Sequence, residues 1–352
     1  MTSPSISVVI TAHDRTKYLL SAVRSVRASV PGGEEAEVVI AANFREAHLE
    51  EELSGLRART LLVTEKAVGA KLAAAIATCQ GEVLCFLEDD DRFLPSKLGA
   101  VHTAFEANPR LVYLHHNVQP IDDQGRPLPA ASYRGREILG LAGLVSLQLS
   151  VGTHPEALRT LPVDPYFTAS AIAVRRSVVQ ERTTWLRQVN LVPDAFLFFA
   201  ALLTGGDLLL DGRPLSEYRV HAANVSSADA TDPEEFFARM SSWSQGLDPS
   251  LKVVEQMVSE KDQGILLESI RGVRAVQRVY AVLRDLSSTR RDMREALEDL
   301  RRVRSSYSWR THADVRTAAR LFLLSPGLVR WLYRRRKSQE RSSAVNAPGR
   351  SG

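Results

Sequence analysis

The feature that most constrains this chain's fold is a short apolar segment that runs directly into four consecutive carboxylates. Residues 82–87 read Glu-Val-Leu-Cys-Phe-Leu, and Glu88, Asp89, Asp90 and Asp91 follow without a break. A continuous apolar run of this length predicts a strand buried on both faces of an α/β sheet. Adjacent carboxylates repel one another by about 1 kcal/mol per pair at 4 Å in water, and by more in a lower dielectric. The fold must therefore supply something that neutralises them.

Two interpretations of this acidic segment follow from its residue types. An all-oxygen cluster suits a hard divalent cation such as Mg²⁺ or Mn²⁺, which in turn holds phosphate oxygens. The carboxyl edge of a parallel sheet is also where α/β proteins bind ligands. The alternative is a solvated acidic turn in which Asp91 caps the helix that follows Pro95. The buried strand before the cluster favours the metal site, because these side chains cannot all turn toward water.

Short apolar runs alternate with helical stretches over the first part of the chain. Strands are predicted over 6–10, 38–42, 61–64, 82–87, 111–115, 169–174 and 208–210, and helices over 17–30, 70–78, 96–107 and 195–203. This alternation predicts a mostly parallel sheet covered by helices. Beyond about residue 232, apolar residues at three- and four-residue steps predict helices broken at 286–288, in a hairpin or coiled coil. We therefore expect an α/β domain over 1–230 and a helical region over 231–352.

Composition excludes several classes of protein. Cys79 and Cys85 are the two cysteines, so thiols can build neither a disulfide framework nor a four-ligand zinc site. The first residues lack the basic start and cleavage site of a signal peptide. No run of about 18 apolar residues is present to cross a bilayer. We expect a cytoplasmic protein.

Charge is distributed unevenly along the chain. Residues 301–352 carry thirteen Lys or Arg against Asp314 and Glu340, a net charge of +11. Since the whole chain carries +4, residues 1–300 carry a net charge of −7. An apolar stretch with Trp331 and Tyr333 leads into the basic residues here, which predicts peripheral contact with an anionic membrane. The alternative is a helix that packs on the preceding hairpin and leaves a solvated basic end. The rest of the chain lacks a basic stripe with interleaved aromatics, so we expect no nucleic-acid partner. Homo-oligomerisation through the C-terminal helices stays open.

Four segments of the chain resemble, in the same order, the motifs of one known enzyme family. The central one, VGAKLAAAIATCQGEVLCFLEDDDRFLPSKL, resembles the core motif of family 2 glycosyltransferases, in which a DxD-like acidic element precedes an aromatic, a Pro and a Lys-Leu. The other three are SVVITAHDR, YFTASAIAVRRSVV and VPDAFLFFAALLTGGDLLLDGRPLSEYRVHAANVS. Together they cover roughly residues 5–227. The resemblance implies a GT-A fold with a Rossmann-like mixed sheet, followed here by an additional helical C-terminal region.

The resemblance also implies a reaction: inverting transfer of a sugar, of hexosyltransferase type, from a nucleotide-diphosphate donor, assisted by Mg²⁺ or Mn²⁺. Glu88 and Asp90 fall on the two acidic positions of the DxD-like element, and Asp90 is the expected direct metal ligand. Asp91 is a further metal ligand, and Asp89 is expected on the donor side. His221, in the segment that reads YRVHAANVS, falls on a histidine that approaches the metal or the diphosphate.

The remaining candidate site residues are a catalytic general base, given by the resemblance, and residues on the nucleotide side of the site. Asp194 in VPDAF occupies the acidic position that acts as general base in the family. Ala12 and Asp14 in the first turn, Asn43 after the second predicted strand and Lys71 are the nucleotide-side candidates. The expected acceptor is a hydroxyl of a glycan, such as a polysaccharide of the cell envelope.

The sequence departs from the family pattern after the second predicted strand. Family members usually carry an Asp-Asp-Gly-Ser-like turn there, with an acidic side chain for a uracil-type base, whereas this chain has Ala-Ala-Asn43-Phe. The donor nucleotide therefore stays open, and a degenerate, non-catalytic glycan-handling protein is one alternative. A sugar nucleotidyltransferase is another, although the first turn lacks the glycine-rich, basic phosphate loop of that class.

Overall fold

A computed structural model of the protein describes residues 5–30, 36–128, 146–150, 152, 158, 165–221, 233–262, 264–303 and 313–345. The chain divides into two compact units. The first comprises Met1–Arg219 with Pro249–Leu267, and the second comprises Val220–Asp248 with Glu268–Gly352. The domain boundary expected near residue 230 stays a prediction.

The first unit is built on a mixed sheet that has nine strands among the described residues. The strands are β1 (Ile6–Ala12), β2 (Glu37–Ala42), β3 (Ala58–Leu62), β4 (Val83–Glu88), β5 (Arg92–Phe93), β6 (Leu111–Ile121), β7 (Ser146–Ser150), β8 (Ile172–Arg175) and β9 (Asp207–Arg219). Their order is β3-β2-β1-β4-β8-β6-β9-β5, and β7 pairs with β9. The α/β prediction is confirmed, and the strand order places β4, with its acidic end, near the middle of the sheet.

The sheet is mixed, so the expectation of a mostly parallel sheet holds only in part. β3, β2, β1 and β4 run parallel, and so do β6 and β9. β8 is antiparallel to both β4 and β6, and β7 and β5 are antiparallel to β9. An apolar run does not reveal strand direction, so the sequence pattern misses this reversal. Because β8 is antiparallel to β4, the residues just before β8 lie at the carboxyl end of β4.

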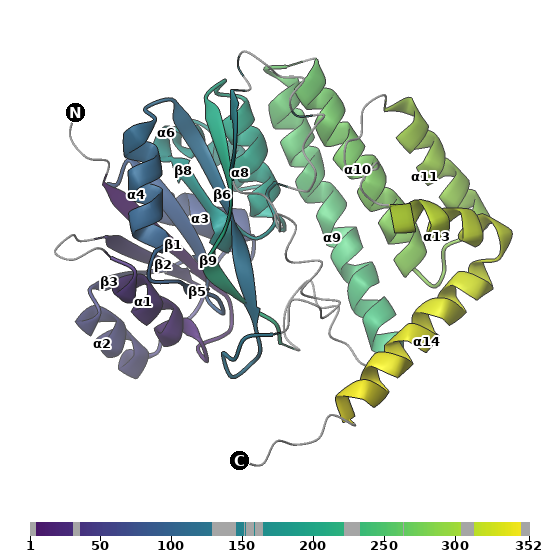
Figure 1. Cartoon of the computed structure of the whole chain (residues 1–352), viewed down its shortest axis with the longest axis horizontal. Coiled ribbons are helices and arrows are strands. Elements are labelled where there is room, and N and C mark those ends of the chain that lie inside the picture. The colour runs from purple at the N-terminus through teal and green to yellow at the C-terminus, as the bar shows by residue number, and fades with distance from the viewer. Residues whose placement is uncertain are drawn as a thin grey trace. The chain divides into compact units, whose positions relative to one another are not determined.

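Helices cover both faces of this sheet (Figure 1). They are α1 (Leu19–Ala28), α2 (Ala47–Gly55), α3 (Val68–Ile76), α4 (Lys97–Ala107), α6 (Arg176–Gln180), α7 (Thr183–Leu186) and α8 (Pro193–Leu202). α1, α2 and α4 share one apolar core with alternate residues of the central strands, such as Val8 and Ile10 of β1. This alternation follows from the two-residue repeat of a strand. α3 contacts β1 and β2, and Phe198 of α8 meets the ring of Tyr113 edge to face.

Strand β9 is much longer than the sequence predicts. The pattern predicts a strand over 208–210, but β9 continues to Arg219. Its pairing with β6 shifts register between Leu111 and Tyr113 and again at the steps from His116 to Val118. The two later shifts in register absorb the residues around Pro214 that interrupt the strand pattern. As a result β9 carries Arg219 past β5 to the acidic end of β4.

The helices that follow β9 are α9 (Pro233–Ser259), α10 (Ile265–Arg284), α11 (Arg290–Arg302), α13 (Ala313–Leu324) and α14 (Pro326–Val345). Residues 249–259 of α9 and 265–267 of α10 belong to the first unit, and the rest of these helices belongs to the second unit, which has an apolar core of its own. Val279 of α10, Met293 of α11, Phe322 of α13 and Val329 of α14 belong to one apolar cluster. α10 ends just before the break expected at 286–288, and Thr289 caps α11 with a reciprocal hydrogen-bond pair to Asp292. The helical C-terminal region is confirmed, and no helix in the described residues is long and apolar enough to span a membrane.

Gly69 in α3 is predicted to be the most size-sensitive glycine near the site. A Cβ atom there would lie 1.9 Å from the carbonyl oxygen of Leu186 and 2.8 Å from that of Val189. Since backbone atoms cannot move aside cheaply, we expect Gly69→Ala to lower the free energy of unfolding by about 1–3 kcal/mol. Gly55→Ala is the matched control, because a Cβ at Gly55 meets nothing within 4 Å. Urea denaturation of both variants measures the difference, and equal stabilities would contradict this close packing.

Candidate active site

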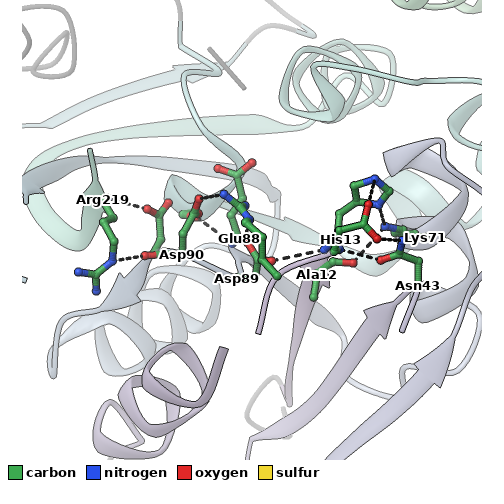
Figure 2. Close-up of polar contacts among 12 residues, drawn as sticks. Ala12, His13, Asn43, Lys71, Glu88, Asp89, Asp90 and Arg219 are labelled. Carbon is green, nitrogen blue, oxygen red and sulfur yellow. Dashed lines mark hydrogen bonds and ion pairs between the residues drawn. The ribbon is translucent and has the colours of Figure 1, made fainter. Parts of the chain in front are cut away.

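The acidic turn, residues 88–91, lies at the carboxyl end of β4 (Figure 2). Glu88, Asp90 and Asp91 each offer one carboxylate oxygen, and these oxygens all lie within 4.8 Å of one another. Asp89, Asp90 and Asp91 are only 3%, 5% and 1% exposed. The Oδ2 atom of Asp91 is buried and has no hydrogen-bond partner among the described residues. Three of the predicted metal ligands, Glu88, Asp90 and Asp91, therefore lie close enough together to share one hard cation.

Residues from two distant segments hold this turn in place. Before β8, the Ser170 hydroxyl accepts a hydrogen bond from the Glu88 N–H at 3.0 Å, and the Thr168 hydroxyl donates to Glu88 Oε2 at 3.1 Å. At the end of β9, the Arg219 N–H donates to Asp91 Oδ1 at 2.8 Å, and its Nε donates to the Asp90 carbonyl at 2.8 Å. Figure 2 shows Arg219 beside the turn. These contacts fix the carboxylates in spite of their repulsion.

The charge of the turn is only partly neutralised by the protein. The guanidinium of Arg15 pairs with Asp89 at 2.6 Å and with Asp90 at 2.8 Å. Burial, followed by the charge of Asp90, raises the pKa of Glu88 to about 8 and that of Asp89 to about 6. The same two causes raise the pKa of Asp91 well above its usual value. The raised pKa values reflect mutual repulsion among the buried carboxylates, and the oxygen-only ligand set suits a divalent cation such as Mg²⁺ or Mn²⁺.

Asp194 lies in the first turn of helix α8. Its negative charge acts on the carboxylates of the acidic turn. After burial and Asp90, its charge is the next contribution that raises the pKa of Glu88. Its Oδ1 atom accepts a hydrogen bond from the Ala195 N–H at 2.9 Å. The structure thus brings Asp194 near the carboxylates, although more than a hundred residues separate it from them in sequence.

The predicted nucleotide-side residues gather at the carboxyl ends of β1 and β2 (Figure 2). Asn43 Nδ2 donates to Asp14 Oδ1 at 2.6 Å, and the Asp14 N–H donates to Asn43 Oδ1 at 3.0 Å. The fully buried Lys71 donates to the Ala12 carbonyl at 3.0 Å and contacts His13 Nδ1 at 2.6 Å. Burial lowers the pKa of Lys71. Asp14, Asn43, Lys71 and the carbonyl of Ala12 therefore form one polar group, and its role at the nucleotide stays a prediction.

A backbone contact joins this polar group to the acidic turn. The His13 N–H donates to Asp89 Oδ2 at 3.4 Å.

Backbone strain marks the same region, because three of the four non-glycine residues with positive φ in the described chain are Asp14, Thr168 and Val192. A β-branched residue such as Val192 rarely adopts this conformation, and such strain concentrates at functional sites. Val192 directly precedes the helix turn that carries Asp194.

Sequence reasoning did not predict the contacts that hold the acidic turn, and the roles of the predicted site residues stay predictions. Arg15, Thr168 and Ser170 stand inside the motifs that carry the resemblance, but only the folded structure shows that they hold the carboxylates. His221 lies two residues past the end of β9 and is 8% exposed. It belongs to the second compact unit, so its predicted role at the metal or diphosphate stays a prediction.

Comparison with known proteins identifies the family. Residues 7–183, half of the chain, match the model of Glycosyl transferase family 2. An uncharacterized glycosyltransferase of Nostoc sp. (strain PCC 7120) is 25% identical over 243 residues, which are 65% of this chain and 70% of that protein. The crystal structures of S. aureus TarS 1–349 in complex with UDP and with UDP-GlcNAc each give a TM-score of 0.49 at 12% identity, covering 97% of this chain and 92% of theirs. The protein is therefore a member of glycosyl transferase family 2, a glycosyltransferase with a GT-A fold and an additional helical C-terminal region.

Proposed function

We propose that this enzyme transfers a sugar from a nucleotide-diphosphate donor to a hydroxyl of a glycan acceptor, with inversion at the anomeric carbon. The acidic turn carries the proposal: Glu88, Asp90 and Asp91 present oxygens within 4.8 Å of one another, and Asp91 Oδ2 lacks a partner among the described residues. Asp90 is the central direct ligand of the proposed cation, and Glu88 and Asp91 complete its carboxylate set. His221 is proposed as a further ligand to the metal or diphosphate.

The bound cation supplies one chemical effect: it offsets the negative charge that builds on the departing diphosphate. Residues of the chain itself add positive charge and hold the carboxylates in position. Arg15 lies between Asp89 and Asp90 and brings a second positive charge to the same place. The hydrogen bonds from Thr168 and Arg219 keep the carboxylates fixed, so that they need not reorganise during the reaction.

The polar group at the ends of β1 and β2 is proposed to bind the nucleotide. The mutual hydrogen bonds of Asp14 and Asn43 give this edge both donors and acceptors for a base or ribose. Asn43 is uncharged, so recognition of the base would rest on hydrogen bonds and on Asp14. The amino group of Lys71 lies against the Ala12 carbonyl, and it is proposed to meet a phosphate on the donor.

Asp194 is proposed as the general base. Its carboxylate would take the proton of the acceptor hydroxyl while the oxygen attacks the anomeric carbon and the bond to the diphosphate breaks. A positioned base of this kind contributes about 10²–10⁴ in rate. A double displacement would need a second nucleophile on the other face of the sugar, and a single base with no such partner favours inversion.

The proposal is tested by a donor screen with the full-length protein. UDP-, GDP-, dTDP- and CDP-sugars are incubated with Mg²⁺ or Mn²⁺, and release of the nucleoside diphosphate is measured with and without a glycan acceptor. We expect release from one donor class that depends on the metal and stops when EDTA is added. Release that is unaffected by EDTA, or no release from any donor by folded protein, would contradict the proposal. Cell-envelope acceptors, a cytoplasmic location and self-association through the C-terminal helices stay predictions.

A further inference from the structure

The outward face of α14 is apolar. Leu328, Trp331 and Leu332 are 43%, 49% and 42% exposed, and Leu324 at the end of α13 is 74% exposed. The spacing of the three α14 residues places them on one side of the helix. Among the described residues, four of the five exposed large hydrophobic side chains fall within 324–332, and the fifth is Leu62. Such a concentration on a surface is typical of an interaction site.

The opposite side of α14 packs against other helices of its own unit. Val329 is 2% exposed and belongs to the same apolar cluster as Phe322. Tyr333 stacks with the ring of Phe236, and Arg334 pairs with Glu234 at 2.7 Å. Contacts on this inner side fix the orientation of the helix about its axis. The apolar residues on the outer side therefore face outward as a consequence of the fold, and the core of this unit does not need them.

The charge on this face is positive. The guanidinium of Arg335 lies 5.2 Å from the centroid of the Trp331 ring. The sequence continues Arg334-Arg335-Arg336-Lys337, and no acidic residue occurs between Asp314 and Glu340. Exposed leucines and a tryptophan beside arginines are the composition of a helix that lies in the plane of a membrane interface. A protein partner would have to cover both the apolar residues and an unbalanced positive charge, whereas an anionic bilayer matches both at once.

We propose that the docking face, formed by Leu324, Leu328, Trp331, Leu332 and Arg335, attaches the enzyme to the surface of an anionic bilayer. The leucine and tryptophan side chains would enter the boundary between head groups and acyl chains, and Arg335 would contact anionic head groups. The helix would lie on the bilayer, since no helix in the described residues is suited to span it. This inference does not depend on the proposed sugar-transfer chemistry.

Vesicle co-sedimentation of the full-length protein tests the docking face. The vesicles are phosphatidylcholine alone or phosphatidylcholine with phosphatidylserine. We expect wild type to sediment with the anionic vesicles and to be released by high salt, because screening weakens the electrostatic part of the attraction. The double variant Leu328→Glu/Trp331→Glu should bind the anionic vesicles at least tenfold more weakly. Leu62→Glu is the matched control: Leu62 is equally exposed but lies on β3, so this variant should bind like wild type.

Two further measurements keep the test decisive. Far-UV circular dichroism checks that the double variant keeps its helical content, as expected for substitutions at exposed positions. Sedimentation velocity without vesicles checks for self-association. Wild type that ignores anionic vesicles, or a folded double variant that binds them as well as wild type, would overturn the proposal. A dimer that the double variant abolishes, with no vesicle binding by wild type, would assign the face to a second copy of the chain and would overturn it as well.

Discussion

Asp194→Asn is expected to reduce sugar transfer by about 10²–10⁴-fold while leaving donor binding nearly unchanged. The asparagine oxygen can still accept the hydrogen bond that the Ala195 N–H gives to Asp194. The amide cannot take a proton from the acceptor hydroxyl, so only the base function is lost. The substitution also removes one of the charges that raise the pKa of Glu88, and metal binding is therefore not expected to weaken. Transfer kinetics combined with calorimetric donor titration separate the two effects.

The control for this prediction is Glu181→Gln. Glu181 is an exposed acid in the segment between β8 and α8, and its substitution should change neither transfer nor donor affinity. A fully active Asp194→Asn enzyme would remove Asp194 as the base. A variant that loses donor binding together with transfer would instead make Asp194 part of the donor site.

Asp90→Asn is expected to abolish measurable metal-dependent donor binding. Asp90 is one of the three residues whose oxygens lie within 4.8 Å of one another. Its charge also contributes to the raised pKa values of Glu88, Asp89 and Asp91. Removing that charge relieves repulsion within the turn, so the variant should unfold no more easily than wild type in spite of losing one ion pair to Arg15. Loss of binding without loss of stability distinguishes a binding residue from a structural one.

Glu82→Gln is the matched control for Asp90→Asn. Glu82 immediately precedes β4, is exposed, and lies at the opposite edge of the sheet from the acidic turn. Its substitution should leave metal and donor binding at the wild-type level. Thermal unfolding and isothermal titration of both variants provide the comparison. Wild-type donor affinity in Asp90→Asn would show that the acidic turn is not the metal-dependent donor site.

The parts of the fold that the sequence predicted are those set by local patterning. β1, β2 and β4 are continuous apolar runs, and α4 follows a proline-containing turn, so their positions could be read from spacing. The reversed direction of β8 and the shifts in register along β9 depend on pairing with strands that are distant in sequence. α2 was missed, because its helix buries only Leu49 and Leu53 and its apolar pattern is correspondingly weak.

The candidate site divides in the same way, into residues that a local sequence pattern or a motif predicts and residues that only tertiary contacts reveal. The acidic turn is visible in the sequence, because four adjacent carboxylates directly follow a buried apolar strand. Asp194, His221 and the nucleotide-side residues were predicted through the family resemblance. The supporting role of Arg219 was not, because it arises from a contact to Asp91 across 128 positions of the chain. Tertiary contacts of this length leave no local signal in a single sequence.

The central claim is that the acidic turn binds a divalent cation on which donor binding depends. Isothermal titration of the full-length protein with Mn²⁺, followed by titration with the nucleoside diphosphate of the active donor, tests it most directly. We expect one Mn²⁺ per chain, nucleotide binding that requires the ion, and loss of both in Asp90→Asn. No heat from Mn²⁺, or nucleotide binding of equal strength in the presence of EDTA, would contradict the claim.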